Sequence, residues 1–237
     1  MQTYLHQFYR NFPNVKTVYI RYEESQHQDA LFDGSHLTFL GTETYIPGIL
    51  RKTYKSFEYF SDEIDRYDFI IRSNISSIVD FQILQKLLGP EFHKIDYFGG
   101  IVSTLRWLDP KGGIHDTKHF GQRFASGTLI GLAVRTVRGL LSTYDQLDEN
   151  IIDDVAISLH VKAMSPETVV YSAPTQLIAV NQQALTREER KNRVAKALDR
   201  ERPLLWRVKT TSRDDDAYEI SIIVKSLLRL MHSDNRT

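Results

Sequence analysis

The chain has 237 residues, of which 41% are hydrophobic and 25% are charged, values typical of a globular protein with a core. Its 30 basic and 30 acidic side chains cancel, so the positive surplus on which nucleic-acid binding depends is missing. The absence of cysteine excludes disulfides, thiolate nucleophiles and cysteine-based zinc sites.

No apolar run approaches the roughly 20 residues that a membrane-spanning helix needs, and the first residues lack the pattern of a signal peptide. We therefore expect a cytoplasmic protein without a membrane span. Its length suits one large α/β domain over residues 1–237 better than two small ones.

The first half of the chain predicts helices that alternate with strands. Apolar residues recur at helical spacing in three segments: residues 4–12, 49–60 and 80–88. Runs of β-branched and aromatic residues predict three strands: residues 15–22, 36–41 and 66–73. An α/β nucleotide-binding fold usually begins with a strand, whereas this chain begins with a predicted helix.

The second half continues the alternation. Strands are expected at residues 97–105, 124–130 and 168–180. Helices are expected at residues 134–144 and 155–163, with an exposed charged helix at 186–202 and an amphipathic helix at 220–231. The alternation predicts an α/β fold with a mainly parallel central sheet and helices on both faces.

The sequence lacks the motifs of several common enzyme classes. The dinucleotide-binding fingerprint and the phosphate-binding P-loop are absent. So are the Gly-x-Ser-x-Gly nucleophile elbow and the His-Glu-x-x-His metal helix. The candidates for chemistry must therefore come from other segments.

Polar residues follow the predicted buried strand 66–73. Arg72, Ser73 and Asn74 stand at its end, the edge where ligands of open α/β sheets bind. The alternative is a core strand that runs into an ordinary Asn-Ser turn.

Two further segments have both a structural and a chemical interpretation. Ser126 and Gly127 form a tight turn or let the backbone approach a ligand closely. Asp153 and Asp154 precede a predicted helix, where carboxylates cap the first turn. The alternative is that they serve as a general base or as metal ligands.

The order and spacing of these segments resemble the fringe-like and β1,3-glycosyltransferases, which adopt the GT-A fold. Asp-Asp-Val at 153–155 matches the motif that carries the catalytic base, and residues 124–130 match a Ser-Gly strand. The chain is also similar to sugar transferases of large DNA viruses and microbes. They share Pro-Gly-Ile-Leu-x-Lys-Thr, here at 47–53, Arg-Ser/Thr-Asn-x-Ser-Ser, at 72–77, and Asp-Asp-Val-Ala-Ile, at 153–157.

This resemblance spans about residues 15–230. It implies transfer of a sugar from a nucleotide-sugar donor, of the UDP- or GDP-sugar class, to a hydroxyl of a glycan or glycoprotein acceptor. Asp154 would be the general base of an inverting transfer, and Asp153 would assist it or hold the helix end. The donor-binding candidates are Lys52, Thr53, Arg72, Asn74, Ser76, Arg207 and Lys209. For residues 206–209 the alternative is an exposed strand with solvated charges. The acceptor-binding candidates are Tyr97, Gly99, Gly100, Ser126 and Gly127.

The chain departs from the family at the metal motif. Where the fringe-like enzymes have an Asp-x-Asp that binds manganese, this sequence has Asn74-Ile75-Ser76. Divalent cations such as Mn²⁺ or Mg²⁺ prefer carboxylate oxygens, so metal dependence stays open and no metal ligand is assigned. The departure also leaves a second possibility, a catalytically inactive relative that binds a sugar or nucleotide.

The loop at residues 109–121 is long enough to suggest a functional or mobile segment, such as a lid that closes over the donor. His115 and His119 also suggest a zinc site, although no further ligand is evident. Trp107 lies just before the loop, where it either packs in the core or stacks on a sugar ring.

Overall fold

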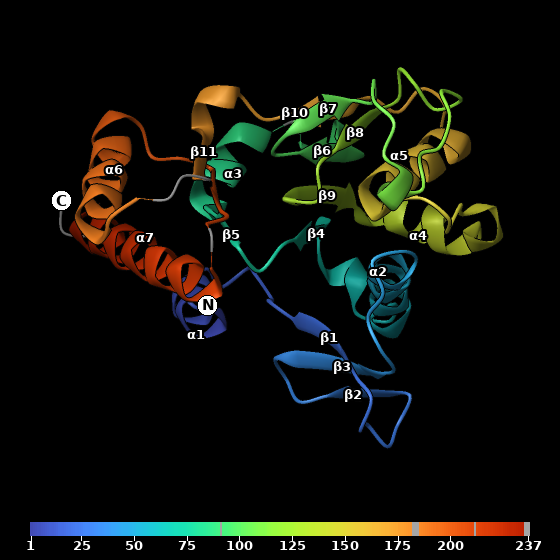
Figure 1. Ribbon diagram of the computed structural model, residues 1–237, viewed down its shortest axis with the longest axis horizontal. Coiled ribbons are helices and arrows are strands. Elements are labelled where there is room, and N and C mark those ends of the chain that lie inside the picture. Colours follow the sequence, from blue (N-terminus) through green and yellow to red (C-terminus); the bar gives the residue numbers. More distant parts are fainter. Residues whose placement is uncertain (91, 182–184, 211, 235–237) are drawn as a thin grey trace. The chain divides into compact units, whose positions relative to one another are not determined.

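The computed structural model describes residues 1–90, 92–181, 185–210 and 212–234 (Figure 1). We expected one domain, and the contacts within the chain gather in two compact units. Unit 1 contains residues 1–17, 73–89 and 174–237, and unit 2 contains residues 18–72 and 90–173. Each unit is described by itself.

The sheet at the centre of unit 2 has four strands, in the order β10-β6-β9-β4. These are β10 (Val170–Ser172), β6 (Tyr97–Gly99), β9 (Leu129–Ala133) and β4 (Phe69–Ser73). Strand β6 pairs parallel with β10 and antiparallel with β9. All five residues of β9 are buried, which explains its continuous apolar sequence.

Three helices pack with this sheet: α2 (Gly48–Tyr59), α4 (Val134–Ser142) and α5 (Asp153–Met164). In Figure 1, α4 and α5 lie beside the strands β6, β8 and β9. The core of unit 2 includes Leu50 and Tyr54 from α2, Leu132 from β9, Val137 from α4 and Ile157 from α5. Burial of these side chains supplies the main driving force for folding this unit.

Two smaller sheets complete unit 2. In the first, β3 (His36–Leu40) lies between β1 (Tyr19–Glu23), to which it is parallel, and β2 (Ala30–Phe32), to which it is antiparallel. The second pairs β7 (Val102–Thr104) antiparallel with β8 (Arg123–Ala125). Helix α5 packs against β8 and thereby joins this pair to the core.

Unit 1 has a three-stranded sheet and four α-helices in its described part. The strands are β11 (Ile178–Asn181), β12 (Leu205–Val208) and β5 (Ser77–Val79), with β12 in the middle. The helices are α1 (Gln2–Tyr9), α3 (Phe81–Leu88), α6 (Arg187–Arg200) and α7 (Arg213–Asp234). Both α1 and α6 pack against α7.

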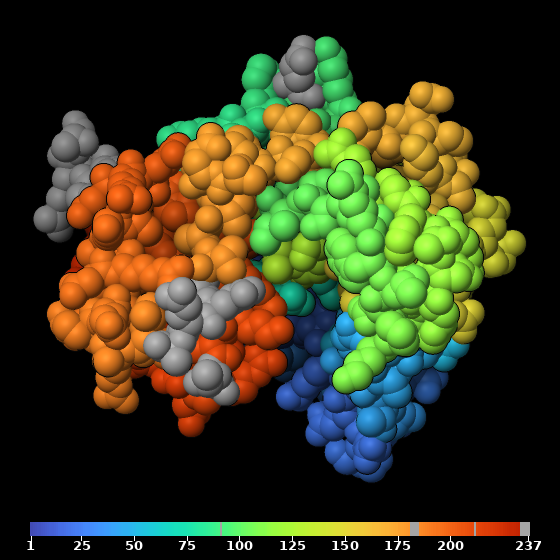
Figure 2. Space-filling model, turned by 45° about the horizontal axis from the view of Figure 1, so that its top comes forward, coloured from blue at the N-terminus to red at the C-terminus, as the bar shows by residue number. Residues whose placement is uncertain are grey.

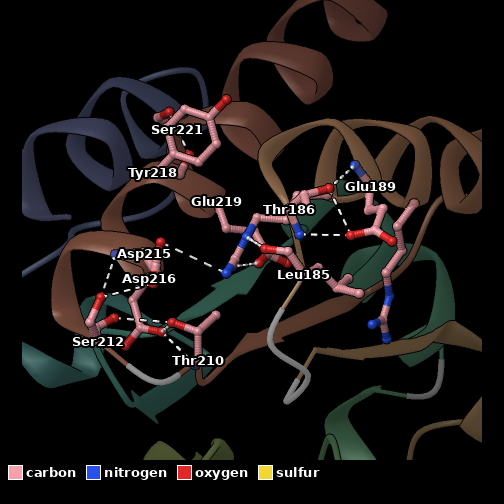
Figure 3. A network of polar contacts seen from close by, with 12 residues as sticks. Leu185, Thr186, Glu189, Thr210, Ser212, Asp215, Asp216, Tyr218, Glu219 and Ser221 are labelled. Carbon is pink, nitrogen blue, oxygen red and sulfur yellow. Dashed lines mark hydrogen bonds and ion pairs between the residues drawn. The ribbon is translucent and has the colours of Figure 1, made fainter.

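A polar network joins α6 to α7 inside unit 1 (Figure 3). Arg190 on α6 is 3% exposed, and its Nη1 donates to Glu219 on α7 across 2.8 Å. Asp215 lies 3.8 Å from the same guanidinium. The sequence predicts an exposed charged helix here, and this is wrong for Arg190 and Val194, which are buried. Charge content alone could not reveal that α7 supplies a buried partner for one arginine.

The α/β class is confirmed, but the described sheets are mixed and not mainly parallel. The reason lies in two predicted strands that break. Residues 97–105 divide at 100–101 into β6 and β7, and residues 124–130 divide at 126–128 into β8 and β9. Each break moves the chain from one sheet to another, which creates the antiparallel pairs β6–β9 and β7–β8.

Two strands, β2 and β5, lie outside the expected elements. The strand considered as the alternative for residues 206–209 is present as β12, but it is largely buried and not exposed. Helix α7 begins at Arg213, seven residues before the predicted amphipathic helix at 220. No helix in the described part of the chain combines the length and apolar character that crossing a membrane requires.

Candidate active site

The first turn of α5 places two carboxylates inside unit 2. Asp153 is 7% exposed and Asp154 is half-buried. The Asp154 carboxylate accepts hydrogen bonds from the backbone N–H groups of Gly127, at 3.2 Å, and Val155, at 2.9 Å. Neither residue is the N-cap, which is Ile152, so helix capping alone does not account for the pair.

The environment of Asp154 suits proton transfer near neutral pH. The pKa of its carboxyl is raised to about 6, mainly by burial and next by the neighbouring Asp153 charge. The Gly127 N–H and the Arg72 charge oppose that rise. The group is therefore mostly ionised at pH 7 and basic enough to accept a proton.

Arg72, near the end of β4, links the Ser-Gly turn to α5. Its Nη1 donates to the carbonyl of Gly127 across 2.6 Å, and its Nη2 forms an ion pair with Asp153. A Cβ at Gly127 would lie 2.3 Å from Arg72 Nη1, so a larger residue there would displace the guanidinium from this position. The structure thus brings Arg72, Gly127, Asp153 and Asp154 together from three segments that lie far apart in the sequence.

A second cation lies close to this group. Lys52 on α2 is 17% exposed at its side chain and forms an ion pair with Glu43. The pKa of Lys52 is lowered to about 8, mainly by burial and next by the charge of Arg72, while Asp153 opposes this. Lys52 and Arg72 together can balance an anionic group near Asp153. Nothing in the sequence marked Glu43, which lies in a loop without periodicity.

Thr53 has a structural role in the observed fold. It is 6% exposed, and its hydroxyl donates to the carbonyl of Ile49 within α2 across 3.0 Å. Its predicted contact with a donor stays a prediction.

The predicted acceptor residues Tyr97, Gly99 and Gly100, in and just after β6, contact the segments on either side of the Ser-Gly turn. Tyr97 is 1% exposed, and its hydroxyl accepts the N–H of Ala125 at 2.9 Å. A Cβ at Gly99 would lie 2.4 Å from the Cβ of Ala125, so the glycine lets β6 approach β8. Gly100 donates to Leu129 across 3.1 Å. These three residues position the turn that contains Ser126 and Gly127, and their contact with an acceptor stays a prediction.

Four predicted donor residues belong to unit 1: Asn74, Ser76, Arg207 and Lys209. Ser76 is 4% exposed, and its hydroxyl accepts from Arg207 on β12. The Asn74 carbonyl accepts the N–H of Ser77 at 2.9 Å, and Lys209 is exposed. These contacts describe a turn tied to the middle strand of the unit 1 sheet, and donor binding there stays a prediction.

Metal-binding groups are not apparent among the residues that the structure describes. Within those ranges, no three His, Asp or Glu side chains gather closely enough to hold a metal ion. His115 is exposed and His119 is half-buried. Asn74 and Ser76, which replace the acidic motif, make the hydrogen bonds given above.

The site therefore combines one proton acceptor, Asp154, with two cations, Arg72 and Lys52. Comparison with known proteins adds no assignment, since no family model and no curated protein matches the chain. Chemically, such an arrangement can deprotonate a hydroxyl while it stabilises negative charge nearby.

Proposed function

We propose that the chain is a nucleotide-sugar-dependent glycosyltransferase that moves a sugar to an acceptor hydroxyl with inversion. The observation that carries the proposal is the half-buried Asp154 carboxylate, with its raised pKa, beside Gly127 and Arg72. The motif order described above supplies the reaction class.

The proposed reaction is a single displacement. Asp154 takes the proton of the acceptor hydroxyl, and that oxygen attacks the anomeric carbon of the donor sugar. The bond from the anomeric carbon to the phosphate oxygen breaks, and the nucleoside diphosphate leaves with the electron pair. Arg72 and Lys52 stabilise the leaving charge, and the ion pair with Asp153 orients Arg72.

A second candidate is an inactive relative that binds a nucleotide sugar without transferring it. The observation that favours it is Asn74-Ile75-Ser76 in place of an acidic motif. Incubation with a panel of UDP- and GDP-sugars, with and without EDTA, separates the two. We expect release of nucleoside diphosphate with at least one donor. Manganese-stimulated release would identify a metal-dependent enzyme, whereas donor binding in a thermal-shift assay without release would establish the binding relative.

The proposed chemistry also predicts a bell-shaped pH profile of kcat/KM. The rate should rise through about pH 6, because Asp154 must be ionised to accept a proton. It should fall above about pH 8, because Lys52 loses its charge there. In the variant Lys52→Arg, the rise of kcat/KM near pH 6 should be unchanged, and the fall at alkaline pH should move to higher pH, since arginine stays charged. A flat profile between pH 5 and pH 9 would contradict these roles.

A further inference from the structure

Two exposed aromatic side chains stand on loops attached to the candidate site. Tyr45 is 53% exposed and Trp107 is 49% exposed. Single exposed aromatics are common on protein surfaces and need no function. These two are distinguished by their connection to the carboxylates of α5.

Tyr45 is held beside those carboxylates. Glu43 pairs with Lys52, and the Thr44 hydroxyl accepts the N–H of Gly48 at 3.0 Å, so the two residues before Tyr45 are fixed to α2. Partial burial raises the pKa of the Tyr45 hydroxyl, and the charges of Asp109, Asp154 and Asp153 raise it further. Tyr45 therefore lies on a loop held to α2, which packs against α5, the helix that contains the proposed base.

Trp107 stands on a loop that is pinned to the start of α5. Asp109 and Ile114 exchange backbone hydrogen bonds of 3.0 and 2.8 Å, and the carbonyl of Gly112 accepts the N–H of Ile152 at 2.8 Å. Gly113, with φ +74°, packs so closely on Asn150 that a Cβ would lie 1.9 Å from its carbonyl oxygen. This part of the loop is anchored beside the proposed base.

The Trp107 indole is not in the core, so the core interpretation of this residue is wrong, and its stacking on a sugar ring stays a prediction. Its ring centroid lies 6.2 Å from that of Phe124 on β8, the strand that leads into the Ser-Gly turn. In Figure 2, the light-blue atoms around the start of α2 lie beside the green atoms of this loop. Asp109, two residues from Trp107, is also the first of the carboxylates that act on Tyr45.

Charge decides which substrate suits this surface. Asp109, Asp153 and Asp154 repel a nucleoside diphosphate near Tyr45, whereas Arg72 and Lys52 attract one. A neutral sugar ring has an apolar C–H face that packs on aromatic rings and hydroxyl groups that donate to carboxylates. The acceptor must also reach Asp154.

We propose that Tyr45 and Trp107 form a platform for the acceptor glycan, on which a neutral pyranose ring packs with its hydroxyl toward Asp154. This inference rests on the proposed function, since it names the substrate class of the same site.

Intrinsic fluorescence tests the platform without any turnover. The chain has two tryptophans, and Trp206 is only 5% exposed, so Trp107 should dominate changes caused by surface binding. We expect titration with neutral oligosaccharides ending in galactose, glucose, N-acetylglucosamine or xylose to change the emission for at least one of them. The change should vanish in Trp107→Phe. Tyr45→Ala should weaken the binding about tenfold. Tyr171→Ala, which removes a 45% exposed aromatic on β10, is the matched control and should bind normally.

The outcomes separate the platform from the transferase activity. A change of emission with UDP or GDP but with no oligosaccharide would overturn the platform. So would an emission that does not change with any oligosaccharide of the panel. Transfer activity with an unchanged acceptor KM in Tyr45→Ala would overturn the platform while the proposed function stands. Glycan binding that depends on Tyr45 and Trp107, without transfer from any donor, would support the platform and contradict the transferase.

Discussion

Replacement of Asp154 by asparagine should lower the transfer rate by about 100-fold to 10,000-fold, the range that general base catalysis usually contributes. Asparagine keeps the size of the side chain and an oxygen that can accept the N–H of Gly127. It cannot accept the proton of the acceptor hydroxyl at neutral pH. The fold and donor binding should therefore persist while turnover is lost.

The comparison needs transfer rates at saturating donor and melting temperatures with and without donor. Asp62→Asn, which changes an exposed carboxylate of the same unit, is the matched control and should keep the wild-type rate. Undiminished turnover in Asp154→Asn would contradict the proposed role of Asp154 as the general base. Loss of donor-induced stabilisation would instead show that Asp154 matters for binding.

Replacement of Arg190 by alanine should reduce the free energy of unfolding by about 3–5 kcal/mol, because the buried Glu219 carboxylate then loses its charged partner. Glu219 is 2% exposed and is hydrogen-bonded to this arginine (Figure 3). Urea unfolding of single variants measures the loss. Lys191→Ala on the same helix removes an exposed pair with Glu188 and should change stability by less than about 0.5 kcal/mol.

A double variant shows whether the instability comes from the unpaired Glu219 charge or from the lost volume of the Arg190 side chain. Arg190→Met combined with Glu219→Leu removes both charges and keeps much of the volume, so it should recover most of the stability. A loss below about 1 kcal/mol in Arg190→Ala would contradict the assigned role of the pair. A double variant as unstable as Arg190→Ala would also contradict it.

Helices were the part of the fold that the sequence predicted best. Their apolar spacing is a local property, and α2 and α5 begin within two residues of the predicted starts. The organisation of the sheets was not predicted. The pairing of strands depends on the two breaks at residues 100–101 and 126–128, and no periodic pattern in the sequence marks these breaks. Gly100 and Gly127 lie at the two breaks, yet a glycine in a strand pattern does not say which sheet the chain joins next.

Motif order identified four residues that the structure brings together, but it did not predict their contacts. Motif order singled out Arg72, Gly127, Asp153 and Asp154, and the structure joins them by an ion pair and hydrogen bonds. The raised pKa of Asp154 depends on burial, which only the tertiary structure supplies. The charges that influence Tyr45 come from Asp109, Asp153 and Asp154, which are distant in sequence, so no local pattern identifies this loop residue.

The anomeric configuration of the product tests the mechanism most directly. If Asp154 deprotonates the acceptor and the sugar transfers in one displacement, the new bond has the opposite configuration to the donor, which the coupling of the anomeric proton in NMR spectra reveals. A carboxylate that attacked the sugar itself would form a covalent intermediate and lead to retention. Inversion is the expected result, and a product that retains the donor configuration would contradict the role of Asp154 as a base.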